Sequence, residues 1–97
     1  LILGGTVQTM SSAGAISVST LETRINSPDG AGTLTIPDGV DGQIKVIVMV
    51  SNTGNHALTI NSNIGHTSIV FNRPGRTATL MFLAGNWYFL GGTATVT

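Results

Sequence analysis

The chain has 97 residues, of which four are Lys or Arg, four are Asp or Glu and none is Cys. One domain fits this length. The 8% of charged residues, against about 25% in an ordinary soluble domain, excludes proteins that bind nucleic acid or a membrane surface through clustered basic side chains.

The composition has two further consequences. Without cysteine the chain has no disulfide, thiolate nucleophile or cysteine-bound zinc. A surface with so few charges consists mostly of Thr, Ser, Asn and Gly, and a net charge of zero favours association. We therefore expect burial against copies of the chain or in a larger assembly, with a small neutral extracellular domain as the alternative.

The first fourteen residues differ from the rest of the chain. They contain Gly and Ser and begin with the apolar residues Leu1, Ile2 and Leu3. We expect residues 1–14 to form an N-terminal arm that docks on a neighbouring subunit, and residues 15–97 to form a single β domain.

The first strand expected within that domain changes phase. Over residues 15–20, Ile16 and Val18 alternate with serines, but the apolar face continues out of phase toward Ile25. A change of phase inside one extended run predicts a β-bulge or a kink near Thr20.

Short apolar runs separated by turn residues continue to the end of the chain. Gly, Asn and Pro-Asp-Gly interrupt the chain every 8 to 12 residues, no run has helical spacing, and β-branched residues are abundant. We predict an all-β fold, a compact antiparallel β-sandwich or small barrel of about seven short strands. The later strands are expected over residues 33–36, 43–51, 57–61, 67–72, 77–83 and 87–90.

The strongest of these strands, over residues 43–51, is apolar on both faces. One face carries Ile44, Val46, Val48 and Val50, and the other carries Lys45, Ile47 and Met49. Such a strand is central in a sheet that is covered on both sides, or it faces a partner subunit. The interface candidates are Ile47 and Met49 from this strand, Tyr88, and Leu1, Ile2 and Leu3 from the arm.

Near the C-terminus, Trp87 and Phe89 alternate in phase after a tight hairpin turn at residues 84–86. We predict that both rings lie in the core across from Leu80 and Phe82, which leaves Tyr88 at the surface or an interface. The alternative is that Trp87 and Tyr88 form a platform on which a sugar ring stacks.

Residues that could carry chemistry are few. His56 and His66 stand beside turns without a third ligand nearby, and the pair Asp38 and Asp41 lacks the further acids that calcium requires. We therefore expect no catalytic, metal-binding or cofactor-binding site, and no enzyme activity.

Several motifs together resemble a known family. They are Gly32-Thr33-Leu34-Thr35-Ile36-Pro37-Asp38-Gly39-Val40-Asp41-Gly42-Gln43-Ile44-Lys45, Gly54-Asn55 before Leu58-Thr59-Ile60, Gly75 before Thr79-Leu80-Met81-Phe82, and Gly85-Asn86-Trp87-Tyr88 running into Leu90-Gly91-Gly92. Over residues 32–92 the chain resembles a small β domain of virion structural proteins from tailed phages and some large DNA viruses. The resemblance implies a trimer-forming or capsid-attached role without catalysis.

From this resemblance we expect a non-enzymatic virion structural protein. The first expectation is a capsid decoration (cement) protein that forms a homo-oligomer, as a trimer, and bridges subunits of the major capsid protein or other virion proteins. The short stretch before Ala15 favours this over the tip of a long fibre. The alternative is a tail-fibre or spike domain that binds a host glycan or surface protein, and a depolymerase is a third, disfavoured reading.

Overall fold

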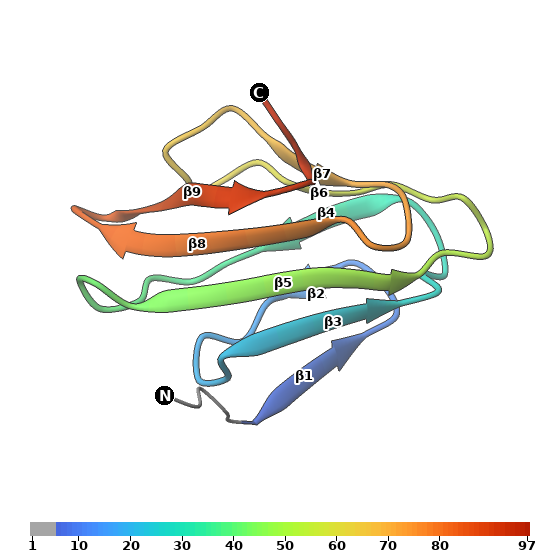
Figure 1. The fold of residues 1–97 in the computed structure, drawn as a ribbon, viewed down its shortest axis with the longest axis horizontal. Helices are drawn as coiled ribbons and strands as arrows, with labels where there is room; N and C mark the ends of the chain where they lie inside the picture. The colour runs from blue at the N-terminus through green and yellow to red at the C-terminus, as the bar shows by residue number, and fades with distance from the viewer. Residues whose placement is uncertain (1–5) are drawn as a thin grey trace.

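Two five-stranded β-sheets face each other in the computed structural model, which describes residues 6–97 (Figure 1). Sheet A has the strand order β1-β3-β5-β8-β9, and sheet B has the order β10-β7-β6-β4-β2. The strands are β1 (Val7–Met10), β2 (Gly14–Ala15), β3 (Glu22–Asn26), β4 (Gly32–Thr35), β5 (Ile44–Ser51), β6 (Leu58–Ile60), β7 (Ile69–Phe71), β8 (Thr77–Leu83), β9 (Asn86–Gly92) and β10 (Thr95–Val96). Nowhere in this range does the chain form a helix suited to crossing a membrane.

The first six strands are wound as a coil. The chain passes from sheet A to sheet B and back with each strand, so β1, β3 and β5 are parallel in sheet A, and β2, β4 and β6 are parallel in sheet B. Beyond β6 the pairs are antiparallel, and β8 and β9 form a hairpin. The predicted all-β sandwich is confirmed, but its sheets are mixed and contain ten strands where about seven antiparallel ones were expected.

The phase change near Thr20 is explained by this winding. The Ile16 amide donates to the Thr35 carbonyl in sheet B (2.7 Å), whereas the Leu21 carbonyl accepts from the Val46 amide in sheet A (2.9 Å). The chain bends at residues 18–21 and crosses between the sheets here. The predicted kink near Thr20 is therefore confirmed, and its alternative, a bulge within one continuous strand, was wrong. Because the two sheets face each other, the side chains that point into the core lie on opposite sides of the backbone before and after the crossing.

The N-terminal segment also differs from the expectation. Val7–Met10 pairs with β3, and Gly14–Ala15 pairs with β4, so these residues are edge strands of the two sheets and not a separate arm. The Gln8 side chain connects them, because its amide donates to the Ala15 carbonyl (3.0 Å) and its carbonyl oxygen accepts from the Ser17 amide (2.7 Å). The interface candidates Leu1, Ile2 and Leu3 lie outside the described residues.

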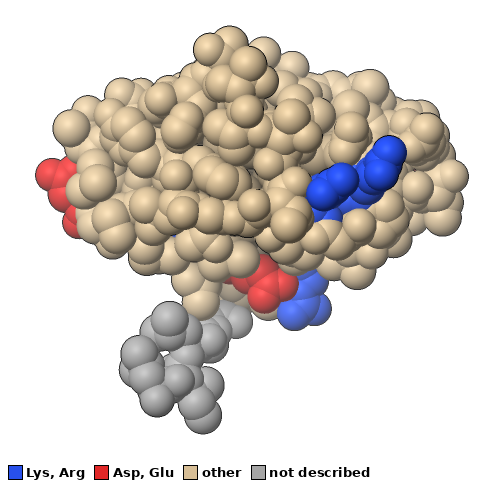
Figure 2. Space-filling view, turned by 45° about the horizontal axis from the view of Figure 1, so that its top comes forward, with Lys and Arg blue, Asp and Glu red and all other residues tan. Residues whose placement is uncertain are grey.

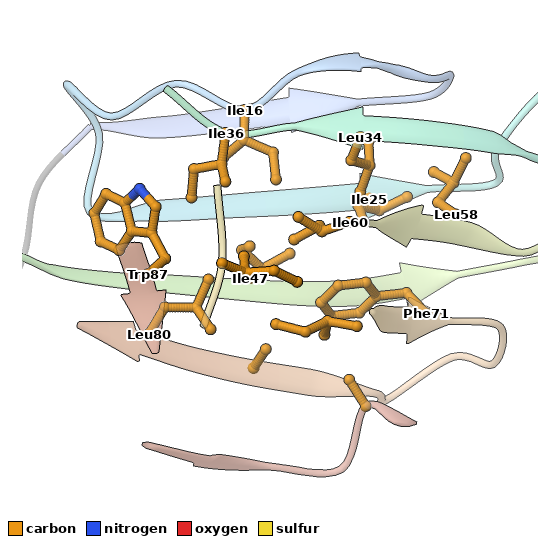
Figure 3. Packing of buried hydrophobic residues seen from close by; sticks show 14 of the residues in the cluster. Ile16, Ile25, Leu34, Ile36, Ile47, Leu58, Ile60, Phe71, Leu80 and Trp87 are labelled. Atoms are coloured by element: carbon orange, nitrogen blue, oxygen red, sulfur yellow. The ribbon is translucent and has the colours of Figure 1, made fainter. Parts of the chain in front are cut away.

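A single apolar layer fills the space between the sheets (Figure 3). As predicted, Trp87 is fully buried and is paired with Phe82, while Phe89 is paired with Leu80 and packs against the core. The buried apolar residues are Ile16, Ile25, Leu34, Ile36, Ile47, Met49, Leu58, Ile60, Ile64, Ile69, Phe71, Ala78, Leu80, Phe82, Trp87 and Ala94.

The Pro-Asp-Gly turn at residues 37–39 closes one end of this layer. The Trp87 Nε1 donates to the Pro37 carbonyl (2.8 Å), and a Cβ atom at Gly39 would lie 2.7 Å from Cζ2 of the indole ring. Only a glycine lets the turn approach the ring so closely. The Pro-Asp-Gly turn and the Trp87 strand therefore meet in one packing contact.

Candidate interaction surface

The central strand of sheet A points its charged face inward. Lys45, Ile47 and Met49 are fully buried between the sheets, whereas Val46 and Val48 lie on the outside of the sandwich. The interface candidates Ile47 and Met49 therefore belong to the core, contrary to the expectation. Choosing Ile47 and Met49 as interface residues implied that the valines lie inside, but the valines face outward.

Lys45 can point inward because Thr20 meets its amine. Its Nζ donates to the carbonyl (3.0 Å) and to the Oγ1 (2.8 Å) of Thr20, in the segment that crosses between the sheets. Burial lowers the pKa of Lys45 to about 8, and the nearby Glu22 opposes this shift. The neutral amine keeps enough N–H groups for both bonds, so the site accepts lysine in either protonation state.

We call the outward side of sheet A the outer face. Strand pairing aligns its side chains in rows that run across the strands. One row consists of Val7, Glu22, Val46 and Thr79, and the next consists of Thr9, Arg24, Val48 and Thr77. Beyond the first row, Ile44 is paired with Met81, and Met81 with Tyr88. The large apolar side chains that this face leaves exposed are Val7, Val50, Leu83 and Leu90.

Charge is nearly absent from the outer face. The strands of sheet A contain three charged residues, and Lys45 is buried, which leaves Glu22 and Arg24. These two form an ion pair with each other, and the pairing raises the pKa of Arg24. In Figure 2, acidic and basic side chains occupy only a few small spots on the side turned to the reader. The outer face is therefore nearly uncharged: it carries apolar residues and threonines, with one neutralised pair of charges.

Tyr88 lies at one margin of this face and is partly exposed. The segment of residues 63–66 runs along the free edge of β9: the Trp87 amide donates to the Asn63 carbonyl (3.0 Å), and the Gly65 amide donates to the Trp87 carbonyl (2.9 Å). His66 Nε2 accepts from the Phe89 amide (2.9 Å), and its ring meets the Tyr88 ring edge-on. This segment therefore covers an edge that would otherwise be open to pairing with another chain.

The structure does not gather the other candidate residues into one site. His56 and His66 lie in loops at opposite ends of β6, and residues 6–97 contain no cluster of three or more possible metal ligands. Asp41 accepts a hydrogen bond from the Ala84 amide (3.3 Å) at the β8–β9 turn. The described part of the chain encloses no pocket. Because Trp87 is fully buried, it does not form the exposed sugar platform.

The sequence shows that the residues of β5 alternate between two faces, but it does not show which face points into the core. The signal that could have given it is the neighbouring strand, where Thr23 and Ile25 alternate with the charged Glu22 and Arg24. Glu22 pairs with Val46 and Arg24 with Val48. Paired residues point to the same side of a sheet, so knowing that these strands are neighbours would have placed the valines outside.

Comparison of the chain with models of known protein families and with curated proteins finds no match.

Proposed function

We propose that this chain is a structural module of a virus particle that acts by packing its outer face against a neighbouring protein subunit. The observation that carries the proposal is the outward line of apolar side chains on β5, in which Val46 and Val48 are partly exposed and Val50 is exposed. Removing such a surface from water contributes about 25 cal/mol per Å². Apolar side chains that a folded protein leaves exposed on one face are candidates for an interaction site.

The viral context is supported by the sequence resemblance of residues 32–92. Within it, the proposed role is that of an oligomeric capsid decoration protein, which holds neighbouring capsid subunits together through repeated contacts. Each contact needs only modest affinity, because many copies on one particle act together. A fibre or spike domain would use the same face to join its neighbours.

Immunolabelling tests this role directly. Antibody raised against the purified chain is applied to particles of the virus that encodes it and viewed by electron microscopy. Labels distributed over the head support decoration, and labels confined to the tail support the fibre or spike. Particles without label anywhere would overturn the viral role.

A matched pair of variants tests the surface. Val48→Asp puts a charge on the outer face, whereas Thr33→Asp puts the same charge on an exposed position of sheet B. Both side chains point away from the core, so we expect both variants to fold. Only Val48→Asp should fail to attach to particles, and equal attachment of the two variants would contradict the proposed surface.

A further inference from the structure

We propose that the peptide bond between Asp29 and Gly30 is a site of spontaneous covalent modification, at which aspartate converts to isoaspartate in the folded protein. The inference goes beyond the proposed function and is independent of it. It starts from the sequence, in which every one of the three aspartates is followed by glycine. Two features of the structure then distinguish these three sites: the hydrogen bonds of their reacting groups and the packing around their glycines.

The reaction needs only the groups of an Asp-Gly sequence and water. The glycine nitrogen attacks Cγ of the aspartate, and its proton leaves with the carboxyl hydroxyl group as water, which closes a succinimide ring. Water then adds to one ring carbonyl, and the bond from that carbon to nitrogen breaks. Addition at Cγ restores aspartate, whereas addition at the former peptide carbonyl gives isoaspartate, with the chain running through Cγ. Glycine favours ring closure because it has no Cβ.

Hydrogen bonds restrain both reacting groups of the Asp41 site. The Gly42 amide donates to the Phe82 carbonyl (2.8 Å), and the Asp41 carboxylate accepts from the Ala84 amide (3.3 Å). The attacking nitrogen and the carboxyl group are therefore both bound to β8 and the turn after it. Ring closure would have to break these hydrogen bonds first, so we expect this site to react slowly.

Packing restrains the Asp38 site. A Cβ atom at Gly39 would lie 2.5 Å from Oε1 of Gln43 and 2.7 Å from Cζ2 of Trp87, so the backbone lies directly against both side chains. The Gln43 side chain is itself fixed, because its Oε1 accepts from the Val40 amide (3.0 Å). Turning the Gly39 nitrogen toward the Asp38 carboxyl group would therefore disturb the closed end of the core.

The Asp29 site has neither restraint. Within residues 6–97 the Gly30 amide has no hydrogen-bond acceptor, and the Asp29 carboxylate has no hydrogen-bond or ion-pair partner. A Cβ atom at Gly30 would meet nothing within 4 Å, and Asp29 is exposed. The glycine nitrogen can therefore approach the carboxyl carbon without breaking a contact.

The product also fits into this loop. The Asp29 amide donates to the Ser11 carbonyl (2.6 Å), and the Gly32 amide donates to the Ala57 carbonyl (3.1 Å). Isoaspartate adds one methylene group to the backbone between these two hydrogen bonds, where the loop is free to absorb it. We therefore expect the modified protein to keep its fold, whereas the same change at Asp38 would displace the turn that closes the core.

Ageing of the full chain tests the assignment, because one tryptic peptide, residues 25–45, contains all three sites. The folded protein and a synthetic peptide of residues 25–45 are incubated side by side in water enriched in heavy oxygen. Fragmentation of the peptide then locates isoaspartate and the incorporated oxygen. All three sites should react in the synthetic peptide. In the folded protein Asp29 should react about tenfold faster than Asp41, the factor that corresponds to about one hydrogen bond, and Asp38 should also be slower than Asp29.

Gly30→Ala is the matched variant. Alanine fits at this position, since a Cβ atom there would meet nothing within 4 Å and the φ angle of Gly30 is not left-handed. The added methyl group hinders ring closure, so the variant should lose most of the product at Asp29 while the other two sites stay as they are. Near-ultraviolet circular dichroism of the buried Trp87 checks that the variant and the aged protein are folded.

Three results would overturn the inference. The first is equal reaction at all three sites of the folded protein, or faster reaction at Asp38 or Asp41 than at Asp29. The second is a folded protein that forms no isoaspartate while the synthetic peptide does. The third is a Gly30→Ala variant that forms as much isoaspartate at Asp29 as the wild type.

Discussion

The outer surfaces of the two sheets differ, although both come from strands that alternate between inward and outward residues. On sheet B the outward row is mainly threonine, which water solvates, and the inward residues Leu34, Ile60 and Ile69 are buried. On sheet A the outward residues of the central strand β5 include three valines, with Glu22, Arg24 and threonines on the neighbouring strands, and the inward residues of β5 include a lysine. Water solvates the first surface well, and we propose that a partner covers the second. Alternation alone therefore does not identify the interior of a sandwich.

The largest expected effect comes from a substitution in the core between the two sheets. Trp87→Ala removes the indole ring from the closed end of the core and should destabilise the domain by about 3–5 kcal/mol. The reason is the cavity left between Phe82 and the turn at residues 37–39. Urea unfolding measures the loss. An unchanged unfolding midpoint would show that the ring does not pack in the core.

Lys45→Met tests the charged residue on the inward side. Because burial lowers the Lys45 pKa from 10.5 to about 8, the unfolded chain binds this proton more tightly than the folded chain does. Folding stability should therefore rise between pH 8 and pH 10.5, and the full cost should be present below pH 8.

After allowance for solvent screening, we expect the unfolding free energy of the wild type to rise by about 1–3 kcal/mol over this pH range. Measuring the unfolding free energy of Lys45→Met at the same pH values separates the contribution of Lys45 from that of other groups. The variant should lack this component of the pH dependence, since methionine has a similar shape without a titrating group. Parallel profiles of the two proteins would contradict the assignment.

A double substitution would give sheet A the outward chemistry of sheet B. Val46→Thr with Val48→Thr keeps the β-branched shape, so the unfolding free energy should change by about 1 kcal/mol or less. Self-association should nevertheless weaken, because threonine loses less water-exposed apolar area on contact than valine does. Sedimentation and thermal melting separate the two effects. A protein that melts far below the wild type would show that these valines are part of the core.

The smallest expected effect concerns the turn between β8 and β9, which holds the rows of sheet A in register. Ala84 (φ 51°) and Gly85 (φ 86°) are both left-handed, as the two-residue turn requires. Asparagine tolerates this conformation better than alanine, so Ala84→Asn should stabilise the domain by about 0.5–1 kcal/mol. Differential scanning calorimetry can detect the increase, and a lower melting temperature would contradict the assigned turn.

Much of the fold could be predicted because local patterns determine it. The strand β8, the tight turn after it and the inward position of Trp87 follow from alternation and turn chemistry within a few residues. The winding of the first six strands could not be predicted, since it depends on pairs such as Glu22 with Val46 that lie far apart in the chain. The outward position of the valines on β5 could not be predicted for the same reason. The face that carries Lys45 points inward because the lysine amine bonds to Thr20, which lies 25 residues earlier in the chain.

The winding also has a consequence for how the chain folds. The β8–β9 hairpin closes a two-residue turn, and hairpins form in about 1–10 μs. By contrast, β5 lies between β3 and β8, and its pairing with β3 joins residues about two dozen positions apart. Non-local pairing of this kind is slow, in the range of about milliseconds to seconds.

During synthesis the first six strands emerge first, but β5, which can already pair with β3, lacks its second partner until β8 has left the ribosome. We therefore expect the domain to gain resistance to protease only after residues 77–92 are available, and the hairpin to act as the template on which the earlier strands assemble.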